Sequence, residues 1–296
     1  MDIKTLKYFL AIAEEKNMTA AAQTLYVSQS ALSRQIKSLE DELGQKLFVR
    51  AGHTMFLTDA GIHLRNRAGQ IIELTERTET ELQHFSSETI QGDIYIGCGE
   101  TKCMKYIVRA IKKVQQSYPH IYFHIQNGNA DEVIKGLKEA IYDFGLIFEP
   151  FPKEQFEFME MPSNHIGGIL LRKDDPFAHK TALTLNDLKQ MSLISSSRKI
   201  SDKHPIAYVL GKEANDLKFT ATYSHAYSAA MMAEEGIGNA IIINDLVELE
   251  AYKDLVFIPL IPKVKLPLSL VWKKHISQNS VHEIFLEELK KEISLL

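Results

Sequence analysis

The sequence predicts an α+β multidomain protein: an N-terminal winged helix-turn-helix, a long linker helix, and a C-terminal α/β domain of two subdomains. Three observations lead to this fold class. Short amphipathic helical patterns with tight breaks between them fill the first 44 residues. After two β-prone runs comes a proline-free, charged stretch of about 30 residues. From Gln91 onward, strand-like and helix-like segments alternate, which is typical of a parallel sheet covered by helices.

Three short helices are expected first. The first carries an apolar stripe at helical spacing, formed by Leu6, Phe9, Leu10 and Ala13. Thr19 is a plausible N-cap for the second helix, "AAAQTL". After the break "YVS", Ser28 offers a cap for the third helix, and Gly44 is placed to end it. A tight turn between the second and third helices matches a helix-turn-helix.

The third helix has two stripes. Its apolar stripe is formed by Leu32, Ile36, Leu39 and Leu43, and its polar stripe by Ser30, Ser33, Arg34 and Lys37. A DNA-reading helix needs one side to dock on its scaffold and one side to enter the major groove. Gln29 can pair with adenine and Arg34 with guanine, while small serines permit close approach. Any solvated surface helix also has a polar face, so on this helix alone both interpretations stay open.

Two segments follow the third helix. The run "KLFVRAGHTMFLT" predicts a hairpin or wing around Ala51-Gly52. From Asp59 to about Glu88 a long helix is expected, weakened by Gly61 and Gly69. Its broad stripe consists of Ile62, Ile72, Thr75, Leu82 and Phe85. Such a helix is expected to pack on another helix, either in a second copy or within its own chain.

The alternation of strands and helices restarts after Pro150, with helices expected through "HPIAYVLGKEA" and, at the end of the alternation, in "DLVELEAY". This predicts two similar subdomains, with "LPLSLVWKK" crossing back to the first. The expected domains are residues 1–58 (winged helix-turn-helix), 59–89 (linker) and 90–296 (α/β domain). Within the last, subdomain I is expected at about 90–161 and 267–296, and subdomain II at about 162–266.

Composition narrows the class of protein. A hydrophobic content of 45% and a charged content of 24% are globular values. No apolar run reaches the roughly 18 residues of a membrane span, and the N-terminus does not resemble a secretory signal. We therefore expect a cytoplasmic protein with no membrane partner. The formal charge of −4 belongs to the whole chain, whereas residues 1–58 carry seven Lys and Arg against six Asp and Glu. A small domain of that balance can still present a basic face to DNA.

The run from Phe9 to Arg50, followed by "LTDAG", resembles the N-terminal domain of LysR-type transcriptional regulators. The matching residues are Phe9, Ala21, Ala22, Leu25, Ser28, Gln29, Ser33, Ile36, Leu39, Glu40, Leu43, Gly44, Leu47, Phe48, Arg50, Leu57, Thr58, Ala60 and Gly61. The order of domains also fits that family, whose effector domain resembles periplasmic binding proteins. The resemblance implies a regulator that binds double-stranded DNA at an interrupted palindrome, as a dimer or tetramer joined through linker helices. It leaves RNA polymerase open as a further partner.

The residues expected to contact DNA are Ser28, Gln29, Ser30, Ser33, Arg34, Lys37, Arg50 and His53. His53 departs from the family, which commonly carries Arg or Lys three residues after the wing arginine. With an ordinary pKa near 6.5, a histidine is mostly neutral at cytosolic pH. We therefore expect DNA binding to tighten modestly below about pH 6.5, an effect that His53→Lys should remove.

An effector is expected between the two lobes, where strand ends meet helix N-termini. By resemblance, four junctions line its pocket: Gly99, Glu100 and Thr101; Asn129; Ser195, Ser196 and Arg198; Tyr223 and His225. Hydroxyls, helix N-termini and Arg198 favour a small anion. Glu100 instead favours a ligand amine, and hence a zwitterion such as an amino acid. Each of these residues is also a common N-cap or strand-end residue without any ligand.

Other functions have weaker support. Cys98 and Cys103 suggest a redox sensor, but buried structural cysteines are the stronger interpretation. The eleven histidines form no metal-ligand pattern, and we expect neither a metal nor a cofactor. An enzyme would need a nucleophile elbow or phosphate loop, and the sequence has neither; no catalytic residue is assigned. A solute-binding protein with an accessory domain would leave the helix-turn-helix unexplained.

Overall fold

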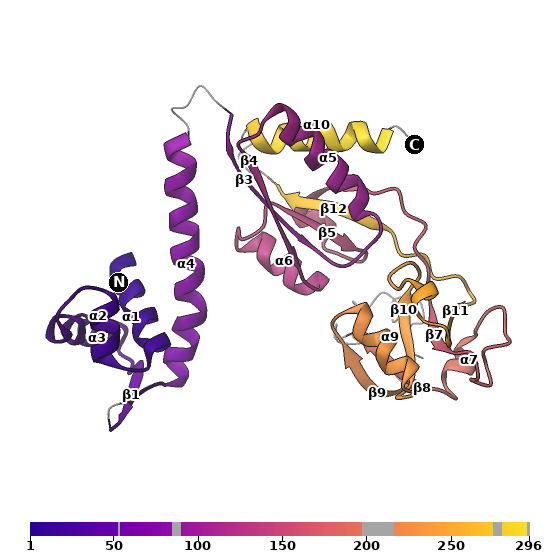
Figure 1. The fold of residues 1–296 in the computed structure, drawn as a ribbon, viewed down its shortest axis with the longest axis horizontal. Coiled ribbons are helices and arrows are strands. Elements are labelled where there is room, and N and C mark those ends of the chain that lie inside the picture. Colours follow the sequence, from indigo (N-terminus) through magenta and orange to yellow (C-terminus); the bar gives the residue numbers. More distant parts are fainter. Residues whose placement is uncertain (53, 85–89, 197–215, 275–279, 295–296) are drawn as a thin grey trace. The chain divides into compact units, whose positions relative to one another are not determined.

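The computed structural model describes residues 1–52, 54–84, 90–196, 216–274 and 280–294 (Figure 1). The chain divides into two compact units, Met1–Glu88 and Thr89–Leu296. No helix in the described ranges is long and apolar enough to cross a membrane.

The first unit is a winged helix-turn-helix followed by a long helix. Its elements are α1 (Ile3–Glu15), α2 (Met18–Thr24), α3 (Gln29–Leu43), β1 (Phe48–Ala51), β2 (Thr54–Leu57) and α4 (Asp59–His84). Asn17, and not Thr19, caps α2: its side chain accepts from the N–H groups of Thr19 and Ala20. Asn is as good a cap as Thr, and only Asn17 has the extended backbone that an N-cap requires.

Helix α3 docks through part of its predicted apolar stripe. Leu32, Ile36 and Leu39 are buried in a core shared with α1 and α2. Leu43 was wrongly assigned to this stripe, since it is 40% exposed. It lies in the last turn, next to Gly44, which ends the helix in a left-handed conformation at φ 65°. Glu40 is buried instead, because the hairpin that follows binds its carboxylate.

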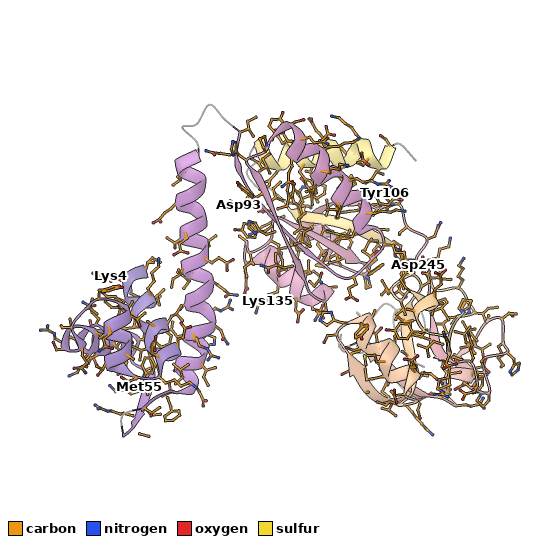
Figure 2. The ribbon with its side chains drawn as sticks, viewed as in Figure 1. Lys4, Met55, Asp93, Tyr106, Lys135 and Asp245 are labelled. Atoms are coloured by element: carbon orange, nitrogen blue, oxygen red, sulfur yellow. The ribbon has the colours of Figure 1, made fainter. Side chains whose placement is uncertain are left out.

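The hairpin is fixed to the helices on both sides. Thr54–Leu57 pairs antiparallel with Phe48–Ala51. The N–H of Met55, labelled in Figure 2, donates to the carbonyl of Lys16 at 2.8 Å. At the other end, the Thr58 hydroxyl donates to the carbonyl of Lys46 at 2.6 Å and accepts from the N–H of Gly61 at 3.0 Å. The wing therefore has a defined position relative to α3.

Helix α4 packs against α1, and this divides the predicted stripe. Leu64, Ala68, Ile71 and Ile72 face the core of the first unit. Lys7 on α1 pairs with Glu76 on α4 at 2.6 Å. Ile62, Leu74 and Leu82 remain 43%, 46% and 62% exposed, so α4 also carries apolar side chains that its own unit does not bury. Phe85 lies outside the described residues.

The second unit contains two five-stranded sheets. In the first the strand order is β4-β3-β5-β12-β6. Its elements are β3 (Gly92–Cys98), α5 (Met104–Ser117), β4 (Ile121–Asn127), α6 (Ala130–Lys138), β5 (Phe144–Phe148), η1 (Lys153–Gln155), β6 (Phe156–Glu160), β12 (Leu268–Lys273) and α10 (Ser280–Ser294). Helices α5 and α10 share one buried cluster with this sheet, and α6 belongs to another. We call this sheet and its helices lobe I.

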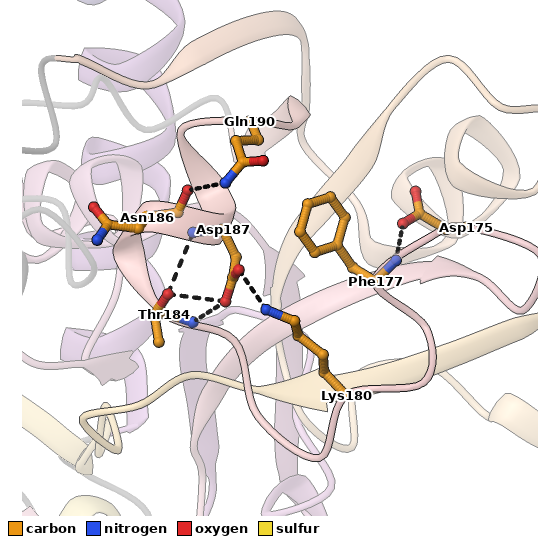
Figure 3. A network of polar contacts seen from close by, with 7 residues as sticks. All are labelled: Asp175, Phe177, Lys180, Thr184, Asn186, Asp187 and Gln190. Atoms are coloured by element: carbon orange, nitrogen blue, oxygen red, sulfur yellow. Dashed lines mark hydrogen bonds and ion pairs between the residues drawn. The ribbon is translucent and has the colours of Figure 1, made fainter.

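The second sheet has the order β11-β7-β10-β8-β9. Its elements are β7 (Gly167–Arg172), α7 (Leu185–Leu188), β8 (Ser192–Ser196), β9 (Lys218–Tyr223), α9 (Ala226–Glu234), β10 (Asn239–Ile243), η3 (Leu249–Ala251) and β11 (Leu255–Pro259). We call this sheet and its helices lobe II. A polar network fixes α7, where Asp187 accepts from Lys180 at 2.6 Å and from the Thr184 N–H and hydroxyl at 2.8 Å (Figure 3).

The prediction of parallel sheets was wrong in part. β3, β4, β5 and β8, β9, β10 are parallel, but β12 and β6 in lobe I and β7 and β11 in lobe II add antiparallel pairs. The segment "LPLSLVWKK" does return to the first sheet, as β12. Strands β6 and β11 were not predicted. "DLVELEAY" was predicted as a helix but contains only the 3-10 turn η3, and the expected helix through "HPIAYVLGKEA" lies outside the described residues.

Candidate functional site

The first candidate site is the exposed side of α3. Ser28 caps the helix, its hydroxyl accepting from the N–H of Ala31 at 3.2 Å. Gln29, Ser30, Arg34 and Lys37 are exposed, and Ser33 is half-buried. Helical spacing puts Ser30, Ser33, Arg34 and Lys37 on one side, opposite the buried Leu32, Ile36 and Leu39. This surface can present hydrogen-bond donors and positive charge to a groove.

The wing contributes one further basic residue. Arg50, on β1, is exposed, and its Nε donates to the carbonyl of Gly52 at 2.9 Å. His53 lies outside the described residues. Tyr26, in the turn before α3, is 96% exposed at a positive φ of 54° and was not among the predicted contacts. No periodicity marks a turn residue of this kind, so only the fold reveals its exposure.

The second candidate site is a cavity of about 390 Å³ in the second unit. The carboxyl ends of strands from both sheets meet around it. Its lining includes six of the predicted effector residues: Gly99, Glu100, Asn129, Ser196, Tyr223 and His225. The sequence had not pointed to its apolar wall, which includes Ile147, Phe148 and Leu266. These side chains belong to buried strand ends and a crossover segment, and only the tertiary fold assembles them.

Three predicted effector residues are not in this lining as described. Thr101 turns its Oγ1 to Nε2 of the buried His165, at 3.1 Å. Ser195 is 1% exposed, and its Oγ has no hydrogen-bond partner among the described residues. Strand alternation puts Ser195 and Ser196 on opposite faces of β8, and Ser196 faces the cavity. Arg198 lies outside the described residues.

Two of the lining residues already have structural partners. Asn129 caps α6 in a capping box, accepting from the N–H groups of Asp131 and Glu132, while the Glu132 carboxylate accepts from the Asn129 N–H. The buried Tyr223 hydroxyl donates to the carbonyl of Ile241 at 2.8 Å. Burial, together with the negative charge of Glu100, raises the pKa of Tyr223 far above its ordinary value. The phenol therefore stays protonated, and Tyr223 lines the cavity as a neutral side chain.

Helix α9 begins at the cavity without a cap of its own. Its N-cap residue His225 makes no side-chain hydrogen bond to the helix. Glu100, on the loop after β3, supplies the acceptor: its Oε2 lies 3.1 Å from the N–H of Ala226. Its Oε1 lies 3.6 Å from His225 Nδ1. The partially positive end of α9 thus already holds a carboxylate from the other lobe.

Each of the two candidate sites lies in a region that matches a domain model of the same protein family. Residues 3–62 match the model of a bacterial regulatory helix-turn-helix protein of the lysR family. Residues 87–294 match the LysR substrate binding domain. The chain belongs to the LysR family. It is a DNA-binding transcriptional regulator with an effector-binding domain, and not an enzyme.

Relatives and solved structures agree with this LysR-family membership. YwqM of Bacillus subtilis (strain 168), an uncharacterized HTH-type transcriptional regulator, is 30% identical over 245 residues, covering 80% of this chain and 81% of YwqM. YvbU of the same strain, described in the same words, is 27% identical over 243 residues, covering 82% and 81%. The fold matches full-length CbnR complexed with its target DNA at a TM-score of 0.72 and 21% identity, covering 99% of this chain and 100% of CbnR.

Proposed function

We propose that this LysR-type regulator reads DNA with the exposed side of α3. The carrying observation is the division of that helix: Ser30, Arg34 and Lys37 are exposed opposite a buried apolar side, and Gln29 is exposed in the first turn. Gln29 and Arg34 are suited to bidentate contacts with adenine and guanine, while Lys37 meets a phosphate. Ser28 and Ser33 permit close approach at the start of the helix.

The wing supplies contacts to the DNA backbone in this proposal. Arg50 uses its Nε within the wing, so its terminal Nη groups are the ones offered to a phosphate. His53 is proposed as the neighbouring phosphate contact, with the pH dependence expected of a histidine. Tyr26 is proposed as a further DNA contact because its side chain is 96% exposed.

The regulator acts as an oligomer on an interrupted palindrome. One reading module contacts only a short half-site, so specific affinity requires two modules. Leu74 and Leu82, which are eight residues apart on α4 and both exposed, support pairing of two copies through this helix. The DNA complex of CbnR, whose fold this chain shares, is a further support. The native mass of the regulator distinguishes an assembly of two copies from one of four.

The cavity of the second unit is the proposed effector site. It combines an apolar wall with the Ser196 side chain, backbone groups of the loop at Gly99 and the beginning of α9. A ligand of a few carbons with one or two charged groups fits this chemistry, which makes a small anion or a zwitterion the proposed effector. Arg198, which lies outside the described residues, is proposed as the counter-charge of a ligand anion because it follows the cavity residue Ser196 in the sequence.

Regulation follows from the two-lobed arrangement. A ligand that binds both lobes favours one arrangement of them, and this changes how linked copies space their reading helices. The bound regulator then alters access of RNA polymerase to the neighbouring promoter. Because its target is chromosomal DNA, its proposed place of action is the cytoplasm.

The test is selection of bound fragments from the host's genomic DNA by the wild type and by Ser33→Ala/Arg34→Ala. Shared imperfect inverted repeats that the variant loses are the expected result. Native mass and effector-domain stability should stay unchanged in the variant. Fragments without any shared repeat, or equal enrichment by both proteins, would show that α3 does not read the sequence.

A further inference from the structure

The loop between β3 and α5 joins the two lobes at consecutive residues. Glu100 Oε2 accepts from the N–H of Ala226, the first residue of α9, at 3.1 Å. Thr101 Oγ1 lies 3.1 Å from Nε2 of His165, which precedes β7. Lys102 Nζ lies 3.0 Å from Glu248 Oε1, just before η3. Residues 100–102, which belong to lobe I, therefore contact three separate segments of lobe II or its connection. We call them the interlobe loop.

The three contacts differ in where they lie. The Lys102–Glu248 pair is exposed, at 51% and 70% of the two side chains, so water screens it strongly. Thr101 points to the buried His165, away from the cavity lining. Glu100 alone both lines the cavity and reaches the beginning of α9.

Glu100 also supplies what α9 lacks. The first N–H groups of a helix have no partner inside the helix, and an N-cap side chain normally accepts from them. His225 makes no such bond, and the N–H of the buried Ala226 donates to Glu100, 126 residues away in sequence. A carboxylate is a strong acceptor at a helix N-terminus, because charge and dipole act together.

We infer that Glu100 occupies the position a ligand carboxylate would take, and that it determines which ligands the cavity admits. This inference rests on the proposed effector cavity. Two carboxylates repel each other at one N–H group, so a simple anion must first displace Glu100 from Ala226. A ligand with an ammonium group meets Glu100 as a counter-charge instead. Until a ligand displaces it, Glu100 holds lobe I against lobe II.

The test uses acetate as the probe, with uncharged acetamide as a probe of the same shape. Full-length protein labelled with ¹⁵N-alanine reports binding through the amide signal of Ala226, assigned by its loss in Ala226→Gly. Acetate is titrated at constant ionic strength into the wild type, Glu100→Ala and Glu100→Gln. Lys102→Met is the matched control, because it breaks an interlobe contact without emptying the beginning of α9.

The expected result is a half-saturating acetate concentration about three- to tenfold lower in Glu100→Ala than in the wild type. Glu100→Gln should fall between them, since it keeps an acceptor but loses the charge. Lys102→Met should match the wild type, and acetamide should distinguish none of the proteins. Equal acetate affinity in the wild type and Glu100→Ala would overturn the inference while leaving the cavity proposal standing. No acetate-dependent shift of Ala226 in any protein would overturn both the inference and the proposed anion site.

Discussion

The carboxylate of Glu40, on α3, accepts a hydrogen bond from the backbone N–H of Leu47 at 2.8 Å. The N–H of Phe48 donates to the same oxygen at 3.2 Å, and Lys46 Nζ to the other at 2.6 Å. One buried side chain of α3 thus satisfies the backbone at the beginning of the wing. The orientation of the wing relative to α3 depends on this carboxylate.

Replacing Glu40 with Ala should therefore destabilise the first unit. It leaves two buried backbone N–H groups without an acceptor, at a cost of about 1–3 kcal/mol. Urea unfolding of the full-length protein, followed by circular dichroism, measures the change in the free energy of unfolding. Asp41→Asn is the control, since Asp41 is an exposed neighbour on the same helix. Equal stability of Glu40→Ala and wild type would show that the wing does not need this acceptor.

The same carboxylate predicts a pH dependence. Burial raises the pKa of Glu40, but the bonds from Lys46, Leu47 and Phe48 lower it more, so the net pKa lies below the ordinary 4.5. A lowered folded-state pKa means that the stabilisation is fully present above pH 4.5 and is lost as the pH falls through the folded-state value. Thermal unfolding from pH 6 to pH 3 should show a steeper acid loss in the wild type than in Glu40→Gln. Parallel curves would contradict this.

Two glycines of α4 should respond oppositely to alanine. A Cβ on Gly61 would lie 2.2 Å from the carbonyl oxygen of Leu47, which is backbone and cannot yield cheaply. Gly61→Ala should therefore destabilise the unit by several kcal/mol and weaken DNA binding. A Cβ on Gly69 meets nothing within 4 Å, so Gly69→Ala should stabilise the helix by about 0.5–1 kcal/mol. Melting temperatures of the two variants check both signs, and a stable Gly61→Ala would disprove the close approach.

Charge on α3 should appear in the salt dependence of DNA binding. Lys37→Ala should weaken binding to all sequences and reduce the slope of log K against log salt by about one unit. Arg34→Ala should in addition relax the preference for one base pair. Arg67→Ala is the matched control, since Arg67 on α4 bonds locally to Gln70 at 3.0 Å. Fluorescence anisotropy with selected and scrambled operators measures both effects, and identical slopes for all four proteins would exclude phosphate contact by Lys37.

Both cysteines should react slowly with thiol reagents in the native protein. Cys98 and Cys103 are 2% and 5% exposed, and burial raises the pKa of each thiol. Their sulfurs are held by Asn127 Oδ1 at 3.6 Å and by the carbonyl of Pro162 at 3.3 Å. Ellman's reagent should label them at least tenfold faster in urea than in buffer. Rapid native labelling would reopen the redox-sensor hypothesis.

Local sequence patterns predicted both ends of α3 and most of its buried side. Ser28 and Gly44 were placed as cap and terminator of α3, and both have those roles. Leu32, Ile36 and Leu39 were placed on its buried side. Leu43 and Glu40 were not distinguished, because periodicity cannot show where a scaffold ends or that a distant backbone needs an acceptor. The same limit hid β6 and β11, whose paired strands β12 and β7 lie more than 80 residues away in sequence.

The sequence by itself determined the order of helices and strands around α3, because spacing and cap chemistry are local. Its resemblance to LysR-type regulators determined the family and the strand ends at which the cavity residues are expected. Only the tertiary structure decided which neighbours of those strand ends meet. In the folded chain Ser196 lines the cavity, whereas Ser195 is buried without a hydrogen-bond partner among the described residues. Thr101 contacts His165, and Glu100 accepts from the N–H of Ala226. The reason is physical: a contact between residues 126 positions apart depends on how two sheets pack, and no local pattern encodes it.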